Sequence, residues 1–143
     1  MYLTILDPAH HGAPPAEGAK HVLVVDDEQA LRALFAHVLA GAGFCVDVAG
    51  DGREALSKIA AHLPDLVVLD IMMPEMDGWE VLARLRQVPD QPPVVLVSAC
   101  PDERRAASAG AAACLGKPLS LRVLVDKCRE TIAARSQPSR VLA

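Results

Sequence analysis

Short apolar runs alternate with helix-like segments along the whole of this 143-residue chain, and this alternation constrains the fold more than any other feature. Runs of four or five residues, rich in valine and leucine, are typical of strands covered on both faces. We expect strands at residues 21–25, 44–48, 66–69, 94–97 and 111–115. Short strands joined by helices predict an α/β fold, in which a five-stranded parallel sheet lies between two layers of helices.

Turn and capping residues mark the helices between these strands. The first helical stripe stops at Gly41 and Gly43, and glycine suits the C-terminus of a helix. Asp51 and Asp77 each have a glutamate three residues later, which is the pattern of a capping box at a helix start. The fourth helix is expected to be short and alanine-rich, over residues 106–110.

The chain is expected to form one domain, over residues 20–134, between two tails. Residues 1–19 carry prolines and glycines without apolar periodicity, so they predict a flexible N-terminal tail, and residues 135–143 predict a short C-terminal one. With 52% hydrophobic and 22% charged residues, the chain is not expected to be disordered. A domain of this length buries about two thirds of its unfolded surface and needs no disulfide or structural metal.

Charge and composition argue against several classes of partner. The net charge of -4 gives no electrostatic reason to bind nucleic acid or an anionic membrane. No run approaches the length of a membrane span, and the N-terminus lacks the basic region of a signal peptide. The cysteines are widely spaced and predict free thiols of a cytoplasmic protein rather than a zinc site, at Cys45, Cys100, Cys114 and Cys128.

Polar side chains stand where the predicted strands end. Asp26 and Asp27 follow the first strand, Asp70 the third, Ser98 the fourth and Lys117 the fifth. Ligands of an open parallel sheet bind outside the carboxyl ends of its strands. A single aspartate there is often only a helix cap, but capping alone does not explain this set.

The charges of this set point to phosphoryl chemistry. Two carboxylates about 4 Å apart repel by about 4 kcal/mol at an effective dielectric constant of about 20. Three clustered acids therefore need a cation or a raised pKa, and Lys117 offsets only one charge. Carboxylates, a backbone carbonyl and water suit Mg²⁺. A carboxylate nucleophile, a metal, a hydroxyl and an ammonium together suggest phosphoryl transfer.

The motifs, in order, resemble those of a known family. The acid pair, the D-x-x-x-P-x-x-D-G block from Asp70 to Gly78, Ser98-Ala99 and Lys117-Pro118 resemble the receiver domain of response regulators in bacterial two-component systems. The resemblance covers residues 20–134. It implies a flavodoxin-like (βα)5 fold with strand order 2-1-3-4-5 and the site where that order reverses.

The resemblance assigns the acids their roles. Asp70 would accept a phosphoryl group from a phosphohistidine on a sensor histidine kinase or a phosphotransfer protein. Asp27 would bind Mg²⁺ directly, Asp26 mainly through water, and the backbone carbonyl of Met72 would be a further ligand beside Asp70. Ser98 would donate a hydrogen bond to the phosphoryl group.

Lys117 would pair with the same phosphoryl group, and the Lys117-Pro118 bond is often cis in the family. The usual aromatic residue three positions before this lysine is here Cys114, so the family's aromatic switch is not expected. Met72 and Cys100 stand beside the path of the hydrolytic water and orient it poorly, which predicts a long-lived phosphorylated form.

The lead hypothesis is a single-domain regulator that signals through a downstream protein target and is not an enzyme for outside substrates. Its last two helices would form the family's usual output and dimerisation face. A degenerate receiver that binds partners without phosphorylation is the first alternative. A phosphatase with an aspartate nucleophile would need a second aspartate where Met72 stands. A nucleotide or flavin fold is disfavoured, because Gly41-Ala-Gly43 lacks the dinucleotide fingerprint.

Overall fold

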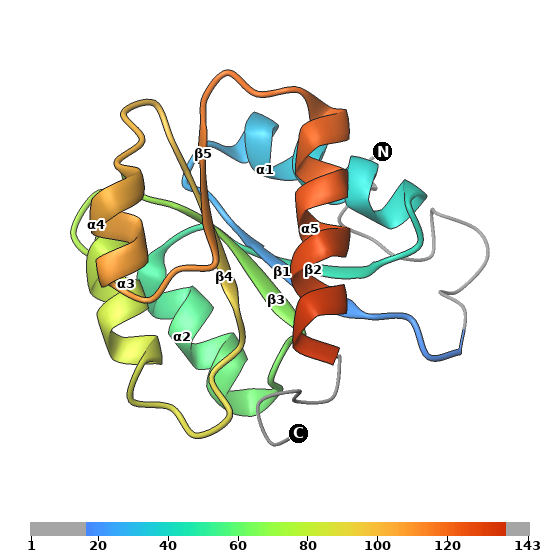
Figure 1. The fold of residues 1–143 in the computed structure, drawn as a ribbon, viewed down its shortest axis with the longest axis horizontal. Coiled ribbons are helices and arrows are strands. Elements are labelled where there is room, and N and C mark those ends of the chain that lie inside the picture. Colours follow the sequence, from blue (N-terminus) through green and yellow to red (C-terminus); the bar gives the residue numbers. More distant parts are fainter. Residues whose placement is uncertain (1–16, 137–143) are drawn as a thin grey trace, which may run out of the picture.

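A parallel sheet of five strands forms the centre of the molecule (Figure 1). The computed structural model of the chain describes residues 17–136. Across the sheet the strand order is β2-β1-β3-β4-β5, which confirms the predicted fold class and order. The strands are β1 (His21–Val25), β2 (Cys45–Ala49), β3 (Leu66–Asp70), β4 (Val94–Ser98) and β5 (Ala113–Gly116).

Helices cover both faces of the sheet and complete the three layers (Figure 1). They are α1 (Gln29–Gly41), α2 (Gly52–Ala61), α3 (Gly78–Leu85), α4 (Glu103–Ser108) and α5 (Leu121–Ser136). Helices α1 and α5 pack on one face, and α2, α3 and α4 pack on the other. Within residues 17–136, no helix is both long and apolar enough to cross a membrane.

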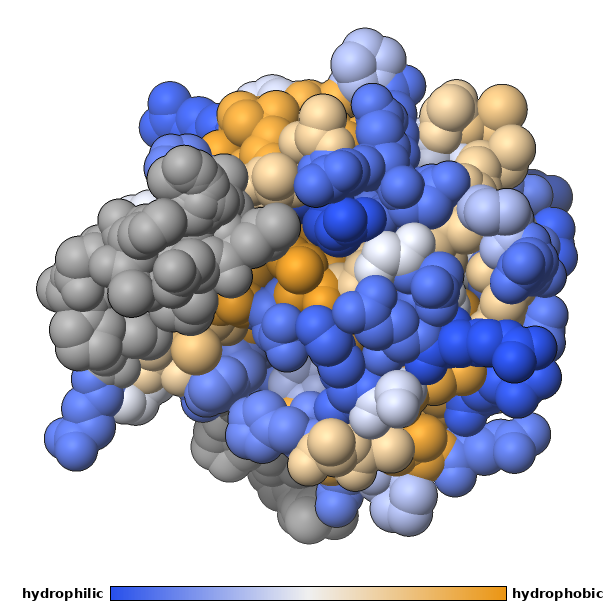
Figure 2. Space-filling model, turned by 180° about the vertical axis from the view of Figure 1, so that it is seen from behind, coloured by the Kyte–Doolittle hydropathy of each residue, from blue (hydrophilic) through white to orange (hydrophobic). Residues whose placement is uncertain are grey.

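The central strands supply both halves of the core. In β3, Val67 and Leu69 face α2–α4, whereas Leu66 and Val68 face α1 and α5. Every residue of β3 and β4 is buried, as the continuous apolar runs predicted. Burying one such side chain contributes roughly 1.5–3 kcal/mol, so the two apolar layers fix the sheet between the helices. On the outer surface, hydrophilic side chains cover most of the face shown in Figure 2.

The predicted caps are present. The Asp51 carboxylate accepts a hydrogen bond from the Glu54 N–H at 2.8 Å, and that of Asp77 accepts from the Glu80 N–H at 2.9 Å. Gly43 has a φ of +103°, the left-handed conformation that glycine adopts at low cost after a helix. These local signals therefore set the start of α2 and α3 and the end of α1.

Several boundaries differ from the sequence predictions. Helix α4 begins at Glu103 rather than at 106, because Asp102 accepts a hydrogen bond from the Arg105 N–H at 2.9 Å and caps it. Strand β5 covers Ala113–Gly116 instead of 111–115, since the chain first turns through Gly110, where φ is +90°. Helix α5 extends to residue 136, two residues into the predicted C-terminal tail. Residues 1–16 and 137–143 of the predicted tails lie outside the described residues.

Candidate functional site

Three carboxylates converge at the carboxyl ends of β1 and β3. These two strands pair in parallel, with Val25 opposite Leu69, so the residues that follow, Asp26 and Asp70, are neighbours across the sheet. One carboxylate oxygen from each of Asp26, Asp27 and Asp70 lies within 4.8 Å of the others. Asp26 and Asp70 are only 2% and 4% exposed, whereas Asp27 is exposed. The cluster is thus buried on two sides and open to solvent at Asp27.

Lys117 brings a cation to the same cluster from the end of β5. Its Nζ lies 3.1 Å from Asp26 Oδ2 and 3.5 Å from Asp70 Oδ1. The peptide bond between Lys117 and Pro118 is cis, as the resemblance implied. The Lys117 N–H also donates to the carbonyl oxygen of Ser98 at 2.8 Å, which fixes the β5 end against β4.

The electrostatics of the cluster are unbalanced. Burial, followed by the charge of Asp26, raises the pKa of Asp70 to about 6, although Lys117 and the Met72 N–H partly oppose this shift. Burial alone would lower the pKa of Lys117, but its hydrogen bond to Asp26 and the charges of Asp26 and Asp70 raise it instead. One ammonium thus faces three carboxylates, and the site carries excess negative charge.

This donor set fits a small hard divalent cation. Carboxylate oxygens at close range from one another are the ligands that Mg²⁺ takes, together with water. Exposed Asp27 leaves an open side for water or a phosphoryl oxygen, and buried Asp26 and Asp70 are held in place. Asp26 is fixed by the Glu28 N–H, which donates to its Oδ1 at 2.9 Å. The residues present therefore suit the metal that the sequence predicted.

Ser98 lies on the neighbouring strand at the same edge. Asp70 pairs with Val97 in the β3–β4 register, so Ser98 ends β4 one position beyond. Its side chain is fully buried, and its Oγ accepts a hydrogen bond from the Cys100 N–H at 3.0 Å. The hydroxyl of Ser98 is thus held at the edge where the acids and Lys117 gather.

Met72 lies beside the acceptor candidate. Its backbone N–H donates to Asp70 Oδ1 at 3.2 Å, and its side chain is 61% exposed.

Cys114 is partly buried and packs against the core layer under α2–α4, so a small side chain occupies the position of the family's aromatic residue. Trp79, which the sequence left without a role, lies under the Arg105 guanidinium, 4.1 Å from its ring centroid.

Two residues shape the site without any role in the sequence predictions. At Gly78, an added Cβ would lie 2.5 Å from the carbonyl oxygen of Asp70 and 2.7 Å from the Cα of Ile71. Only glycine therefore allows the start of α3 to approach β3 so closely, and the glycine that ends the D-x-x-x-P-x-x-D-G block was the available signal. Arg32 donates to the carbonyl oxygen of Asp26 at 2.8 Å, and no motif pointed to it.

The comparisons with known proteins agree with this geometry. A family model described as the response regulator receiver domain matches residues 22–129. A curated relative, the response regulator MprA of Mycolicibacterium vanbaalenii, is 44% identical over 111 residues, which cover 76% of this chain and 48% of that protein. The chain thus spans about half the length of the curated relatives it matches.

Solved structures show the same fold. A CheY-like response regulator receiver domain protein from Methanospirillum hungatei superposes with a TM-score of 0.78 at 27% identity, covering 82% of this chain and 97% of that one. The receiver domain of the Francisella response regulator 1452 gives the same TM-score at 29% identity, covering 82% and 99%. With its fold, its matched residues and its relatives in agreement, the chain belongs to the response regulator receiver domain family, a family of regulatory domains.

Proposed function

We propose that this domain accepts a phosphoryl group on Asp70 in a Mg²⁺-dependent reaction and passes the signal on through protein contacts. One observation carries the proposal: Asp26, Asp27 and Asp70 place carboxylate oxygens within 4.8 Å of one another, and Lys117 reaches two of these acids. The family's regulatory role supports the same function.

In the proposed step, a carboxylate oxygen of Asp70 attacks the phosphorus of a phosphohistidine. The O–P bond forms, the N–P bond breaks, and its electron pair stays on the leaving imidazole nitrogen. Bound Mg²⁺, held by Asp26, Asp27, Asp70 and the Met72 carbonyl, would neutralise charge on the phosphoryl oxygens. Lys117, already 3.5 Å from Asp70 Oδ1, would pair with a phosphoryl oxygen.

Ser98 is proposed to donate a hydrogen bond to the phosphoryl group. Its Oγ accepts from the Cys100 N–H, and an accepting hydroxyl keeps its own proton available as a donor. The phosphodonor would be a sensor histidine kinase or a histidine phosphotransfer protein. The receiving partner would be a downstream protein, and the surface of α4 and α5 is the proposed output and dimerisation face.

Incubation with Mg²⁺ and a small acyl phosphate, followed by intact-mass measurement, tests the proposal. The wild-type chain should gain the mass of one phosphoryl group, and Asp70→Asn should gain none. Asp51→Asn, a matched change at an exposed helix cap, should behave as wild type. An adduct that persists in Asp70→Asn, or that forms equally well with a chelator in place of Mg²⁺, would contradict the assignment.

The same preparation separates the two other candidates. A wild-type chain that gains no mass would favour a binding module that works without phosphorylation, for which Cys114 in place of an aromatic is the supporting feature. Rapid turnover of p-nitrophenyl phosphate would favour a phosphatase. We expect none, since Met72 occupies the place where such an enzyme carries its second aspartate.

A further inference from the structure

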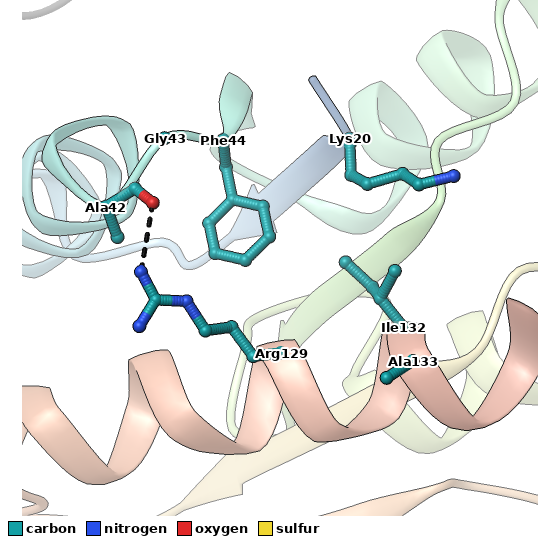
Figure 3. Close-up of a pocket in the computed structure, with 7 residues that line it drawn as sticks. All are labelled: Lys20, Ala42, Gly43, Phe44, Arg129, Ile132 and Ala133. Atoms are coloured by element: carbon teal, nitrogen blue, oxygen red, sulfur yellow. Dashed lines mark hydrogen bonds between the residues drawn. The ribbon is translucent and has the colours of Figure 1, made fainter. Parts of the chain in front are cut away.

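A groove of about 350 Å³ lies between the C-terminal end of α1 and helix α5, beside the start of β1. Its interior is apolar. Phe44, just before β2, and Ile132 of α5 point toward one another across it (Figure 3). Ala42 and Ala133 line its walls, and these small side chains leave the space open.

The rim of the groove is basic. Arg129 and Lys20 are exposed and stand at its two sides (Figure 3). Arg129 donates to the carbonyl oxygen of Ala42 at 3.1 Å, which holds its guanidinium at the edge. No acidic side chain is among the described residues that line the groove. An occupant should therefore combine apolar side chains with a negative charge.

One segment of this chain has that chemistry. Residues 2–6, Tyr-Leu-Thr-Ile-Leu, form a nearly continuous apolar run that precedes the described residues, and Asp7 follows directly. Tyrosine, leucine and isoleucine offer side chains for the apolar interior. The carboxylate of Asp7 would then reach the basic rim formed by Lys20 and Arg129.

The tether brings this segment to the groove. Lys20 itself lines the groove, and Asp7 stands only thirteen residues before it. The intervening chain can extend to about 45 Å, and as a coil it spans about 20 Å. The chain enters β1 through a turn at Glu17 and Gly18, where φ of Gly18 is +83°. Such a short link gives an effective concentration on the order of millimolar, far above that of a second copy in dilute solution.

We propose that residues 2–7 of the same chain dock in the groove between α1 and α5. This revises the expectation of a flexible tail for that segment. Docking leaves the acidic cluster open. The groove lies at the start of β1, whereas Asp26 follows the end of that strand, and the five residues of β1 separate the two by about 16 Å. The segment would cover Phe44 and Ile132, and so would extend the apolar layer under α5.

Tyr2 is the only tyrosine, so fluorotyrosine incorporated into the full chain gives a single ¹⁹F resonance from this segment. In the folded protein we expect a resonance shifted and at least twofold broader than that of a synthetic peptide of residues 1–16. Ala133→Glu, which fills the groove and opposes Asp7, should return the resonance close to the peptide position. Ala134→Glu is the matched control. Ala134 is also exposed but lines another groove, so the wild-type resonance should remain.

Three outcomes would overturn the proposal. The first is a wild-type resonance equal to that of the peptide, which would leave the groove free for another protein. The second is an equal response to Ala133→Glu and Ala134→Glu. The third is a shift that fades on tenfold dilution, since an intramolecular contact does not depend on concentration and docking onto a second copy does. Circular dichroism of both variants verifies that the helices persist.

Discussion

Asp70 carries a buried carboxylate beside Asp26, and the cost of its charge can be measured as a free energy of unfolding. Its side chain is 4% exposed, and an oxygen of Asp26 and one of Asp27 lie within 4.8 Å of it. We predict that Asp70→Asn stabilises the metal-free protein. Asparagine keeps the shape and can still accept the hydrogen bond from the Met72 N–H, but it carries no charge.

The magnitude follows from the raised pKa of Asp70, which burial and then Asp26 move from 3.8 to about 6. A difference of about two pKa units corresponds to about 3 kcal/mol. Because the pKa is higher in the folded state, folding favours the protonated form. The penalty is absent below about pH 4, grows between about pH 4 and 6, and is complete at higher pH.

Urea unfolding at pH 8 in the presence of a chelator measures this gain. With a slope of about 2 kcal/mol/M, the midpoint of Asp70→Asn should rise by about 1.5 M. Near pH 4 the two proteins should unfold together, and Asp51→Asn should match wild type throughout, since asparagine caps a helix as well as aspartate does. A variant that is no more stable than wild type at pH 8 would refute the argument that burial and the charge of Asp26 penalise the Asp70 carboxylate.

Three further predictions concern packing, hydrolysis and thiols. Gly78→Ala should lower the free energy of unfolding in urea by about 3 kcal/mol, because the added Cβ would lie 2.5 Å from backbone. Gly41→Ala, whose added Cβ has no atom within 4 Å, should raise it by about 0.5 kcal/mol. Equal effects would contradict the close approach of α3 to β3 at Gly78. Met72→Asn should speed decay of the phosphorylated form about fivefold, as expected for one added hydrogen bond to water, and an unchanged decay followed by intact mass would count against it. Alkylation at pH 8 should modify exposed Cys100 first and spare buried Cys128, since burial raises the pKa of the Cys128 thiol to about 12; early modification of Cys128 would contradict its burial.

The sequence was sufficient for most of the architecture because the physics of the central strands is local. A strand buried on both faces must be apolar throughout, so the run from Leu66 to Leu69 marked β3 without any knowledge of its neighbours. The caps at Asp51 and Asp77 were equally local, since donor and acceptor stand three residues apart. Such elements need no tertiary contact to be recognised.

What the sequence missed depends on distant parts of the chain. The steric need for glycine at position 78 arises from the backbone of Asp70 and Ile71 on another element. The stacking of Arg105 on Trp79 joins α4 to α3, and neither residue alone indicates a partner. The start of α4 was missed for another reason. Asp102 has no glutamate at the capping-box position, and a single capping aspartate is a weak signal in a short helix.

Locating the phosphoryl group on the chain decides whether Asp70 is the acceptor. After incubation with Mg²⁺ and a small acyl phosphate, borohydride reduces an acyl phosphate to an alcohol but leaves free carboxylates intact. Trypsin then releases a peptide from Ile59 to Arg84, which contains Asp65, Asp70 and Asp77. We predict homoserine at position 70 alone in the fragment spectrum. Homoserine at another aspartate, or an unreduced peptide from a protein that has gained the phosphoryl mass, would contradict it.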